Sequence, residues 1–490
     1  MSHEEITNLA LRRAIFFPSA EIYPNSPGGF WEFGPIGTKI RNKVLDVWRK
    51  ELVQQEDFEE IFGAQILPEK VFEASGHLQS FNDPIVQCKK CHSLYRADKL
   101  IEDQTKELIP ESLTCEDFDR IINGRGISCN KCKSKEFEKV RKFNMMMGLD
   151  IGATGEIKGY LRPETCQNIF LDFQRVYKVS RKNLPLGIAQ AGSAFRNEIA
   201  PRNTLLRERE LGQMEAEIFF NPKKIDEIDK WNEIENYELG LVLPNEKEIK
   251  RFTCRRAVAE KIVSGRLIAY YLARVQQLYE KYGFPLEKMR FRGLVAEERA
   301  FYAKETWDFE VLTSLGWIEL IANNYRGDHD LLSHLEGSGT DLSVNEDGEK
   351  FIPHVFEISA GIDRTVYAIL DNSFKNEKRG QDERIYLSMP ARVSPYHIAI
   401  FPLVKKDGIA EKAVQIKKLL EKRFDIVYDE KGSIGRRYAR VDEIGIPFAI
   451  TVDYQTMEDG TVTLRKRDDM GQERIEIEKI AKKIEGIFYD

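Results

Sequence analysis

The stretch 194–220, AFRNEIAPRNTLLRERELGQMEAEIFF, constrains the fold more than any other part of the chain. Its pattern predicts a strand, a charged loop and a returning strand. Alternate residues of a strand face the same side of a sheet, so Arg196 and Glu198 project together from the first strand and Glu215 and Glu217 from the second. A sheet face that carries arginines and carboxylates is costly to bury without partners or a ligand. An isolated hairpin of this kind is usually a solvated surface, so the rest of the chain must decide between a surface and a site.

Length and composition describe a multidomain globular protein. A chain of 490 residues is too long for one ordinary core, so two to four domains are expected. No apolar run approaches the roughly 20 residues that span a bilayer, and the N-terminus MSHEEITNLALRR lacks a secretory signal. We therefore expect a cytoplasmic protein with no membrane partner. The net charge of −6 gives no global sign of nucleic-acid binding, so any RNA contact must come from local patches.

Seven cysteines in a long chain without a signal indicate a reducing compartment. Four of them form two C-x-x-C pairs, Cys88 with Cys91 and Cys129 with Cys132. Two such pairs make a tetrahedral four-sulfur site for structural zinc, with no open position for catalysis. Unligated cysteines are the alternative, and a redox role is weaker because neither pair opens a thioredoxin-like unit. His92 and Cys115 lie nearby and are better explained as a surface residue and a small core residue.

Three further stretches place charged groups at the ends of predicted elements. Glu164 follows an Arg-Pro pair and precedes a predicted helix, where a carboxylate also suits the helix dipole. Glu319 is the one carboxylate of an apolar strand and needs a cation or a metal as partner. Glu357 and Ser359 share a strand face, and Arg364 lies in the first turn of the next helix, whose amide groups favour an anion. This last stretch is compatible with a phosphate clamp.

The middle and the end of the chain differ in pattern. Residues 221–300 are rich in Lys and Glu and predict an insertion with a solvated amphipathic helix over 257–282. From about residue 391, strands alternate with helices, which predicts a separate α/β domain of about 100 residues. In an acidic chain, its basic cluster is either a solvated face or a nucleic-acid patch. The cluster consists of Arg436, Arg437, Arg440, Arg465, Lys466 and Arg467.

Taken together, these stretches resemble the class II aminoacyl-tRNA synthetases and, more narrowly, the homodimeric glycyl-tRNA synthetases. GFWEFGPIG with its following helix resembles the first class motif, AFRNE with RERELGQMEAE the second, and EISAGIDR the third. RPETCQ, LYRADKL and GWIEL are similar to segments particular to glycyl enzymes. The resemblance covers nearly the whole chain except 221–300. Leu211, Ile358 and Ser193 depart from the family's usual Phe, Pro and Lys, and none of them removes a charged group assigned to the chemistry.

The resemblance implies an α+β fold. Its parts are a class II catalytic domain with an antiparallel sheet, a zinc-ribbon-like insert and a C-terminal α/β anticodon-binding domain. The implied boundaries are 1–84 with 140–390 for the discontinuous catalytic domain, 85–139 for the zinc-binding insert, 221–300 for an insertion within the catalytic domain, and 391–490 for the anticodon-binding domain. The first motif would build the interface of a homodimer.

The implied activity is ATP-dependent attachment of glycine to tRNA(Gly) through a glycyl adenylate, with AMP and diphosphate released. Arg196 and Arg364 are the implied catalytic residues. The implied ATP-binding residues are Arg196, Asn197, Glu198, Leu206, Arg207, Glu208, Leu211, Glu319, Leu320, Gly361 and Arg364. The implied glycine-binding residues are Arg96, Glu164, Glu215, Glu357 and Ser359. Glu319 is the first candidate for a Mg²⁺ ligand, the four paired cysteines hold Zn²⁺, and Glu217 has no assigned role.

Two other functions compete with this one. Another class IIa synthetase would need a pocket for a side chain, which three converging glutamates do not provide. A non-catalytic, synthetase-like RNA-binding protein would not need Arg196, Glu198 and Arg364, all of which are present. Arg96 also suits binding of the tRNA end, because it adjoins the zinc insert.

Overall fold

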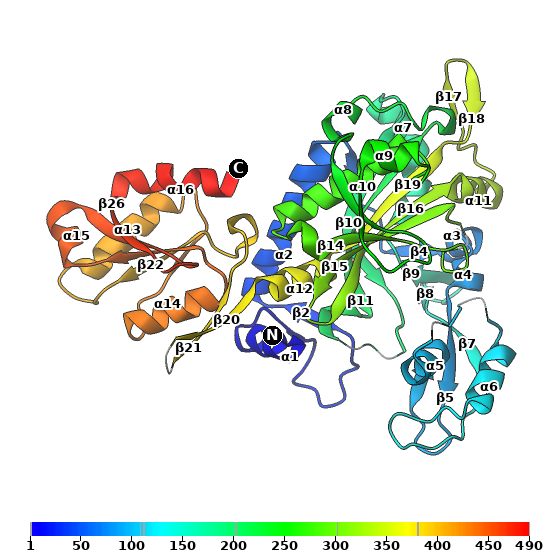
Figure 1. The fold of residues 1–490 in the computed structure, drawn as a ribbon, viewed down its shortest axis with the longest axis horizontal. Helices are drawn as coiled ribbons and strands as arrows, with labels where there is room; N and C mark the ends of the chain where they lie inside the picture. The colour runs from blue at the N-terminus through cyan, green and yellow to red at the C-terminus, as the bar shows by residue number, and fades with distance from the viewer. Residues whose placement is uncertain are drawn as a thin grey trace.

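The structure is a computed structural model that describes residues 2–107, 109–110, 113–199, 201, 203–300, 302–379 and 382–489. A core domain surrounds a large sheet, a small insert hangs from one end of it, and a C-terminal domain lies at the other end (Figure 1). Among the described residues, none of the helices combines the length and the apolarity needed to cross a bilayer.

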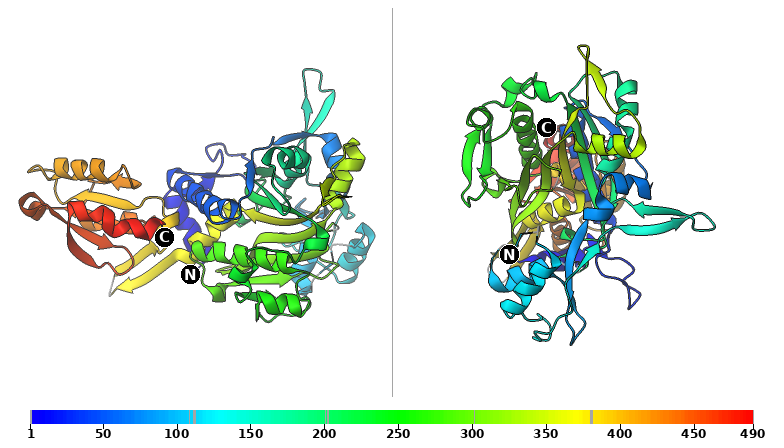
Figure 2. Two further views of the ribbon diagram at one scale, coloured as in Figure 1. Left: turned by 90° about the horizontal axis from the view of Figure 1, so that it is seen from above. Right: turned by 90° about the vertical axis from the view of Figure 1, so that its right-hand side faces the viewer.

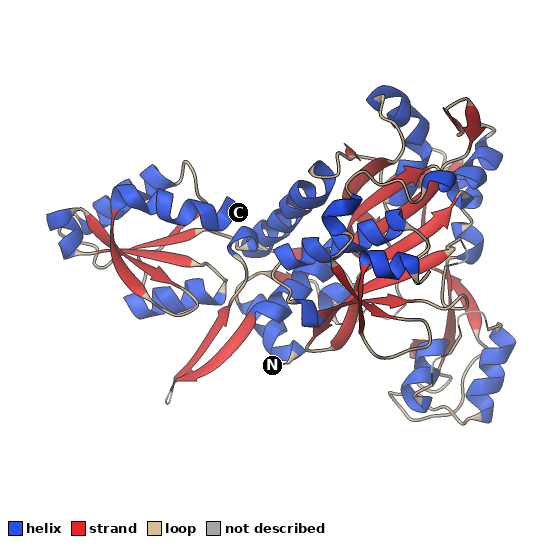
Figure 3. Ribbon diagram, turned by 45° about the horizontal axis from the view of Figure 1, so that its top comes forward, coloured by secondary structure: helices blue, strands red, loops and turns tan. Residues whose placement is uncertain are grey.

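The core domain is organised around a nine-stranded sheet. In spatial order its strands are β13 (Lys250–Thr253), β12 (Glu238–Val242), β14 (Met289–Gly293), β15 (Glu305–Thr313), β16 (Gly316–Gly327), β19 (His354–Gly361), β11 (Glu210–Phe220), β10 (Leu186–Phe195) and β3 (Glu59–Ile61). Every neighbouring pair from β14 to β10 is antiparallel, and β3 adds a parallel edge strand. Helices flank this sheet (Figure 3), which confirms the expected fold class.

The hairpin of β10 and β11 divides its side chains between two environments, as the alternation predicts. Met214, Ala216 and Ile218 of β11 are fully buried in the main hydrophobic core. This core also contains side chains of α2 (Pro35–Trp48), its continuation η1 (Arg49–Gln54), α10 (Arg266–Lys281) and α12 (Ile362–Ser373). The predicted apolar stripe of α2 and η1 through Val44, Trp48 and Leu52 belongs to it.

The opposite face of the sheet is only partly covered by helices. Phe219 of β11 stacks on Phe173 of α7 (Cys166–Ser180), with ring centroids 4.2 Å apart. Leu331 of α11 (His329–Ser338) joins the same cluster. Glu215 and Glu217 lie on this face and are buried.

Residues 221–300 are part of the large sheet, which corrects the expected solvated segment. They supply β12, β13 and β14, and 11 of the 16 residues of α10 are buried. The helix predicted over 257–282 is two helices, α9 (Cys254–Ala259) and α10, and α10 starts after Gly265. Helix α10 is amphipathic, but most of its residues pack against the domain and few of them meet solvent.

Two smaller sheets lie beyond the core domain's large one. The insert, expected over 85–139, has a sheet that extends beyond those bounds, with β5 (Asn82–Gln87), β6 (Leu94–Arg96) and β7 (Arg141–Asn144), and the helices α5 (Ala97–Thr105) and α6 (Cys115–Gly124). The other sheet contains β4 (Ile66–Pro68), β8 (Met147–Ile151) and β9 (Ile157–Leu161), near α3 (Glu69–Ala74) and α4 (His77–Ser80). The hairpin of β8 and β9 projects from the domain (Figure 2).

The remaining elements of the core domain are short. They are α1 (His3–Arg12), β1 (Phe16–Pro18), β2 (Trp31–Phe33), α8 (Trp231–Ile234), β17 (Val344–Glu346) and β18 (Glu349–Phe351). A hairpin of β20 (Phe374–Arg379) and β21 (Asp382–Leu387) then leads to the C-terminal domain.

The C-terminal domain is a separate α/β unit, as predicted. Its five-stranded sheet consists of β23 (Ile426–Tyr428), β22 (Ile398–Pro402), β24 (Phe448–Val452), β25 (Thr461–Lys466) and β26 (Gln472–Glu476). Helices α13 (Ile409–Leu420) and α16 (Ile480–Tyr489) belong to the core on one face and α14 (Ile434–Glu443) to the core on the other. The short α15 (Tyr454–Asp459) precedes β25.

The predicted basic cluster of this domain is divided by burial. Arg437, Arg465 and Arg467 are buried, and each bonds to the domain itself. Arg437 donates to the carbonyl oxygen of Gly432, Arg465 pairs with Asp442 at 2.8 Å, and Arg467 donates to the carbonyl oxygen of Gly445 at 2.8 Å. Half of the cluster is therefore structural and unavailable to RNA. Arg436 and Lys466 are exposed.

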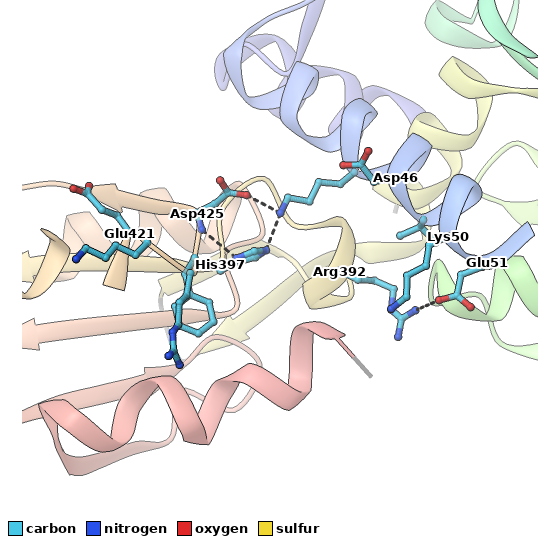
Figure 4. A pocket seen from close by; sticks show the side chains of 12 residues that line it. Asp46, Lys50, Glu51, Arg392, His397, Glu421 and Asp425 are labelled. Carbon is cyan, nitrogen blue, oxygen red and sulfur yellow. Dashed lines mark hydrogen bonds and ion pairs between the residues drawn. The ribbon is translucent and has the colours of Figure 1, made fainter. Parts of the chain in front are cut away.

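Polar contacts join helix α2 to the C-terminal domain around a cavity of about 460 Å³ (Figure 4). Lys43 Nζ lies 2.7 Å from Asp425 Oδ2 and 2.7 Å from His397 Nε2. Arg392 NH1 lies 3.4 Å from Glu51 Oε1. The first-motif helix and the C-terminal domain are thus in direct contact.

Candidate active site

Four glutamates converge on the polar face of β11 and β19. In the register of these strands, Glu215 lies opposite Ser359 and Glu217 lies opposite Glu357. Glu164 approaches from the turn before α7, where its neighbour Thr165 donates a hydrogen bond to Glu215. The structure therefore brings Glu164, Glu215, Glu357 and Ser359 together, as expected from the sequence.

Protein donors fix the orientation of Glu164 and Glu215. Ser359 donates its hydroxyl to Glu215 Oε1, opposite the bond from Thr165 to Oε2. On Glu164, Gln167 Nε2 lies 2.9 Å and His77 Nε2 lies 3.2 Å from Oε1. Both groups contact Oε1 of Glu164, so a ligand would contact Oε2.

Glu357 belongs to a buried ion-pair network. Its Oε1 is 2.7 Å from Arg326 NH1, and its Oε2 accepts from Asn324 Nδ2 at 2.5 Å. Arg326 also pairs through two nitrogens with Asp330, at 2.6 and 2.7 Å. Arg326 and Asp330 are four residues apart in the sequence, whereas the link from Arg326 to Glu357 comes from the pairing of β16 with β19.

Burial and mutual repulsion separate the pKa values of these acids. Burial would raise the pKa of Glu164, but His77 and Arg326 outweigh it and hold this pKa well below its usual range. Burial, followed by the charge of Glu164, raises the pKa of Glu215, and burial raises that of Glu357 to about 7. Such a cluster favours a bound cation, which relieves the repulsion.

The ATP-binding residues expected from the sequence lie next to this cluster. Strand β10 ends at Phe195, so Arg196, Asn197 and Glu198 lie in the loop that follows and not in the strand as predicted. Arg196 Nε donates to the carbonyl oxygen of Pro163 at 3.0 Å, which joins it to the turn that carries Glu164. Loop backbone has no pleat, so strand alternation does not apply there.

Arg364 bridges the loop after β10 and strand β16. Its Nε donates to the carbonyl oxygen of Leu206 at 3.1 Å, and its NH1 lies 3.9 Å from Glu319 Oε1. A small cavity of about 20 Å³ lies beside it. Its lining includes Arg196, Glu198, Leu206, Arg207, Glu208, Leu211, Gly361 and Arg364. Leu320 packs into the hydrophobic core, so it could meet ATP only through its backbone.

Glu208 lines this cavity in a buried environment that favours its protonated form. Burial and the neighbouring Asp363 raise the pKa of Glu208 well above its usual range. Its Oε2 has no hydrogen-bond partner within the described residues.

A larger cavity of about 540 Å³ lies between the insert and the core domain. It is lined by Arg96 and Lys99 from the insert and by Arg207, Glu319 and Arg364, among others, from the core domain. Arg96, which the resemblance assigns to glycine, therefore lines the same cavity as Arg207, Glu319 and Arg364, which it assigns to ATP.

Several polar residues of the site gave no recognisable pattern in the sequence. Asp308 of β15 is buried, and burial and Glu319 raise its pKa well above the usual range. His77 reaches Glu164 only through tertiary packing. Neither position has a spacing that links it to the motifs.

The departures from the family pattern are accommodated. Ile358 is buried in the core, on the strand face opposite to Glu357 and Ser359. Leu211 lines the small cavity. The backbone carbonyl oxygen of Ser193 accepts from Arg162 Nε at 2.9 Å, so this position contributes through its main chain.

The four paired cysteines form a compact group. Their ligand atoms all lie within 4.8 Å of one another, with Cys88 and Cys132 Sγ 3.6 Å apart and Cys91 and Cys129 Sγ 3.5 Å apart. Sulfurs bound to one zinc ion in tetrahedral geometry lie roughly 3.8 Å apart. The turns after Cys88 and Cys129 have the same backbone hydrogen bond. His92 N donates to Cys88 O and Lys133 N donates to Cys129 O, each at 2.9 Å. The thiol arrangement therefore fits zinc, while His92 is exposed, as predicted.

Comparison with known protein families matches both large domains. Residues 154–373 match the tRNA synthetase class II core domain (G, H, P, S and T), and residues 397–487 match an anticodon binding domain. A solved structure described as the RNA binding domain of threonyl-tRNA synthetase from Cryptosporidium parvum superposes with a TM-score of 0.61. It covers 99% of this chain and 98% of its own at 16% identity, so this likeness concerns the fold alone.

Curated relatives narrow the assignment to one amino acid. A glycine–tRNA ligase from Thermococcus gammatolerans is 37% identical over 99% of this chain and 98% of its own length. The corresponding enzyme from Pyrococcus horikoshii is 37% identical over 99% of both chains, and that from Methanothrix thermoacetophila 36% identical over 97% and 95%. With this full-length identity and the class II core, the chain belongs to the glycine–tRNA ligases, the enzymes that attach glycine to tRNA.

Proposed function

We propose that glycine is activated where the glutamate cluster meets the loop after β10. The glycine carboxylate attacks the α-phosphorus of ATP, which gives glycyl adenylate and diphosphate. Because the nucleophile is already an anion, no protein base is required, and catalysis consists of positioning and charge neutralisation. Arg196 would contact both the α-phosphate and the glycine carboxylate. Its bond to Pro163, beside Glu164, supports this role.

The nucleotide would lie along the loop after β10. Glu198 would accept a hydrogen bond from the adenine amino group, and Arg364 would cover the ring and contact the γ-phosphate. The lining shared by Arg364, Arg207, Leu206 and Leu211 supports this placement.

Magnesium bound with ATP would neutralise phosphate charge. Glu319 would hold it, with Asp308 as a second carboxylate near Glu319. Carboxylates are the ligands that suit this hard cation.

The glycine ammonium group would bind among Glu164, Glu215 and Glu357, beside Ser359. One observation carries this proposal: these three acids, with Asp330, outnumber Arg326 and His77, the basic groups within ion-pair distance of them in the described part of the chain. An ammonium ion would supply the missing positive charge. Selection against larger amino acids would be steric, since overpacking by one methyl group costs on the order of 1–3 kcal/mol.

In the second step, the 3′-terminal ribose hydroxyl of tRNA(Gly) attacks the adenylate and releases AMP. The C-terminal domain would bind the anticodon, with its exposed Arg436 and Lys466 as phosphate contacts. Structural zinc would bind at Cys88, Cys91, Cys129 and Cys132. The free thiols suit a cytoplasmic location.

A homodimer would form through the first motif and the edge strand β3. Phe62, directly after β3, is 84% exposed, and Val179 of α7 is 77% exposed. Within the described residues, β3 pairs with β10 only, so its other edge can accept a partner strand. Sedimentation of the Phe62→Ser variant and of the native protein tests this interface. If the variant keeps a mass near twice the 56.7 kDa of one chain, the proposed interface is wrong.

Amino-acid-dependent exchange of diphosphate with ATP tests the activation step. Glycine alone should stimulate the exchange, and stimulation by another amino acid in its place would disprove the pocket assignment. Arg196→Ala should lower the exchange at least about a hundredfold, the loss typical of a single transition-state charge contact. Lys178→Ala, on α7, is a matched control on the same domain and should retain full activity.

A further inference from the structure

A row of alternating charges runs from the zinc insert to the loop after β10. In order, it consists of Asp98, Arg96, Asp83, Arg207 and Glu198. Arg96 NH2 lies 2.6 Å from Asp98 Oδ2, and Arg96 NH1 lies 3.0 Å from Asp83 Oδ1. Arg207 NH2 lies 3.8 Å from Asp83 Oδ2, and Arg207 Nε donates to Glu198 Oε2 at 2.6 Å.

Asp83 is the central member of this row and is held rigidly. It lies on β5, where it pairs with Phe143 of β7, and it is 4% exposed. Its Oδ2 is buried and has no hydrogen-bond partner within the described residues, although Arg207 lies close to it. A buried carboxylate oxygen in this state needs a charge partner, and Arg207 NH2 faces it at 3.8 Å.

The geometry assigns Asp83 as a positioning residue for ATP. Its charge holds the NH2 end of the Arg207 guanidinium away from Glu198, so that only Nε contacts Glu198. This inference rests on the proposed function, in which Glu198 binds the adenine amino group.

The physical reason lies in the shape of the guanidinium group. An arginine facing one carboxylate forms two parallel bonds that occupy both carboxylate oxygens. Between Asp83 and Glu198, Arg207 divides its donors and leaves Glu198 Oε1 to accept from adenine. Without the charge of Asp83, Arg207 closes on Glu198 with both donors and competes with the nucleotide.

The test measures KM values in glycine-dependent diphosphate exchange for Asp83→Asn and Asp98→Asn. Asp98 is equally buried and pairs with Arg96, but it does not face Arg207, so it is the matched control. Asp83→Asn should raise the KM for ATP at least about fivefold and change the KM for glycine less than about twofold, since a charge partner is lost on the nucleotide side alone. Asp98→Asn should leave the KM for ATP unchanged.

An ATP analogue without the 6-amino group, purine riboside triphosphate, separates positioning from general loosening. The native enzyme should prefer ATP over this analogue, and Asp83→Asn should lose most of that preference. If Asp83→Asn weakens the use of ATP and of the analogue equally, the inference is overturned.

A double variant keeps the inference testable if Asp83→Asn is poorly folded. Because Arg207 transmits the effect, Asp83→Asn with Arg207→Gln should be no worse than Arg207→Gln alone. If the double variant raises the KM for ATP by the product of the two single effects, the inference is overturned. If Glu198→Gln leaves the KM for ATP unchanged, the proposed function fails. If Glu198→Gln raises the KM for ATP and Asp83→Asn does not, only the role of Asp83 is rejected.

Discussion

Glu217 of β11 lies directly opposite Glu357 of β19, and both carboxyl groups are buried. Glu357 has Arg326 as partner, whereas neither oxygen of Glu217 has a hydrogen-bond partner in the described part of the chain. Burial, followed by the charge of Glu357, raises the pKa of Glu217 well above its usual range. The raised pKa favours the protonated form of Glu217.

Glu217→Gln should preserve glycine activation, because the raised pKa of Glu217 favours the protonated form that glutamine resembles. The native acid ionises on unfolding at pH 7, so its raised pKa lowers stability above the ordinary pKa of about 4.3. The variant should gain about 1.4 kcal/mol in the free energy of unfolding per pH unit above that value, until the native group itself ionises. Denaturant unfolding from pH 4 to pH 7 measures this gain.

Glu357→Gln provides the contrast, because it removes the charged partner of buried Arg326. Breaking a buried pair costs about 3–5 kcal/mol, so the KM for glycine should rise at least about tenfold and stability should fall. If both glutamine variants behaved alike, the different charge states inferred for the two acids would be wrong.

Zinc should be bound in one equivalent and should stabilise the insert. Cys129→Ser removes one of the four thiolates and should lower bound zinc to near zero, with loss of the insert's protease resistance, since structural zinc supplies folding energy. Cys115→Ser, which changes a cysteine outside the group, should keep its zinc. Metal analysis of both purified variants gives the answer, and zinc retained by Cys129→Ser would exclude the four-thiolate site.

Local patterns predicted the parts of this fold that depend on short spacing. The hairpin alternation around Glu215, the zinc cysteines and the position of Glu164 before a helix all follow from neighbouring residues. Long-range packing decided the rest. The contact of His77 with Glu164 and the link from Arg326 to Glu357 depend on how strands pair, which spacing does not encode.

Arg436 and Arg437 are adjacent in sequence but differ in burial, so the sequence alone does not divide the basic cluster. Arg437→Ala should destabilise the C-terminal domain by about 1–3 kcal/mol, because it leaves the carbonyl oxygens of Gly432 and Pro402 without their donor. Arg436→Ala should leave stability unchanged and weaken tRNA binding with a reduced salt dependence. Thermal unfolding and filter binding at two salt concentrations distinguish the two variants. Normal stability of Arg437→Ala would contradict the buried role.

Lys43 connects the first-motif helix α2 to Asp425 and His397 of the C-terminal domain (Figure 4). Burial, followed by the charge of Lys43, lowers the pKa of His397 to about 4, so the imidazole is neutral at pH 7 and Lys43 pairs with Asp425. Lys43→Ala removes this pair and should loosen the orientation of the anticodon-binding domain. The kcat/KM for tRNA should fall about fivefold, the equivalent of about 1 kcal/mol, while glycine-dependent diphosphate exchange stays normal. Lys39→Ala, whose Nζ lies 3.9 Å from Asp425, should have a smaller effect. If Lys43→Ala lowered tRNA aminoacylation and diphosphate exchange equally, the effect of Lys43 would lie in the core domain and not in its contact with the C-terminal domain.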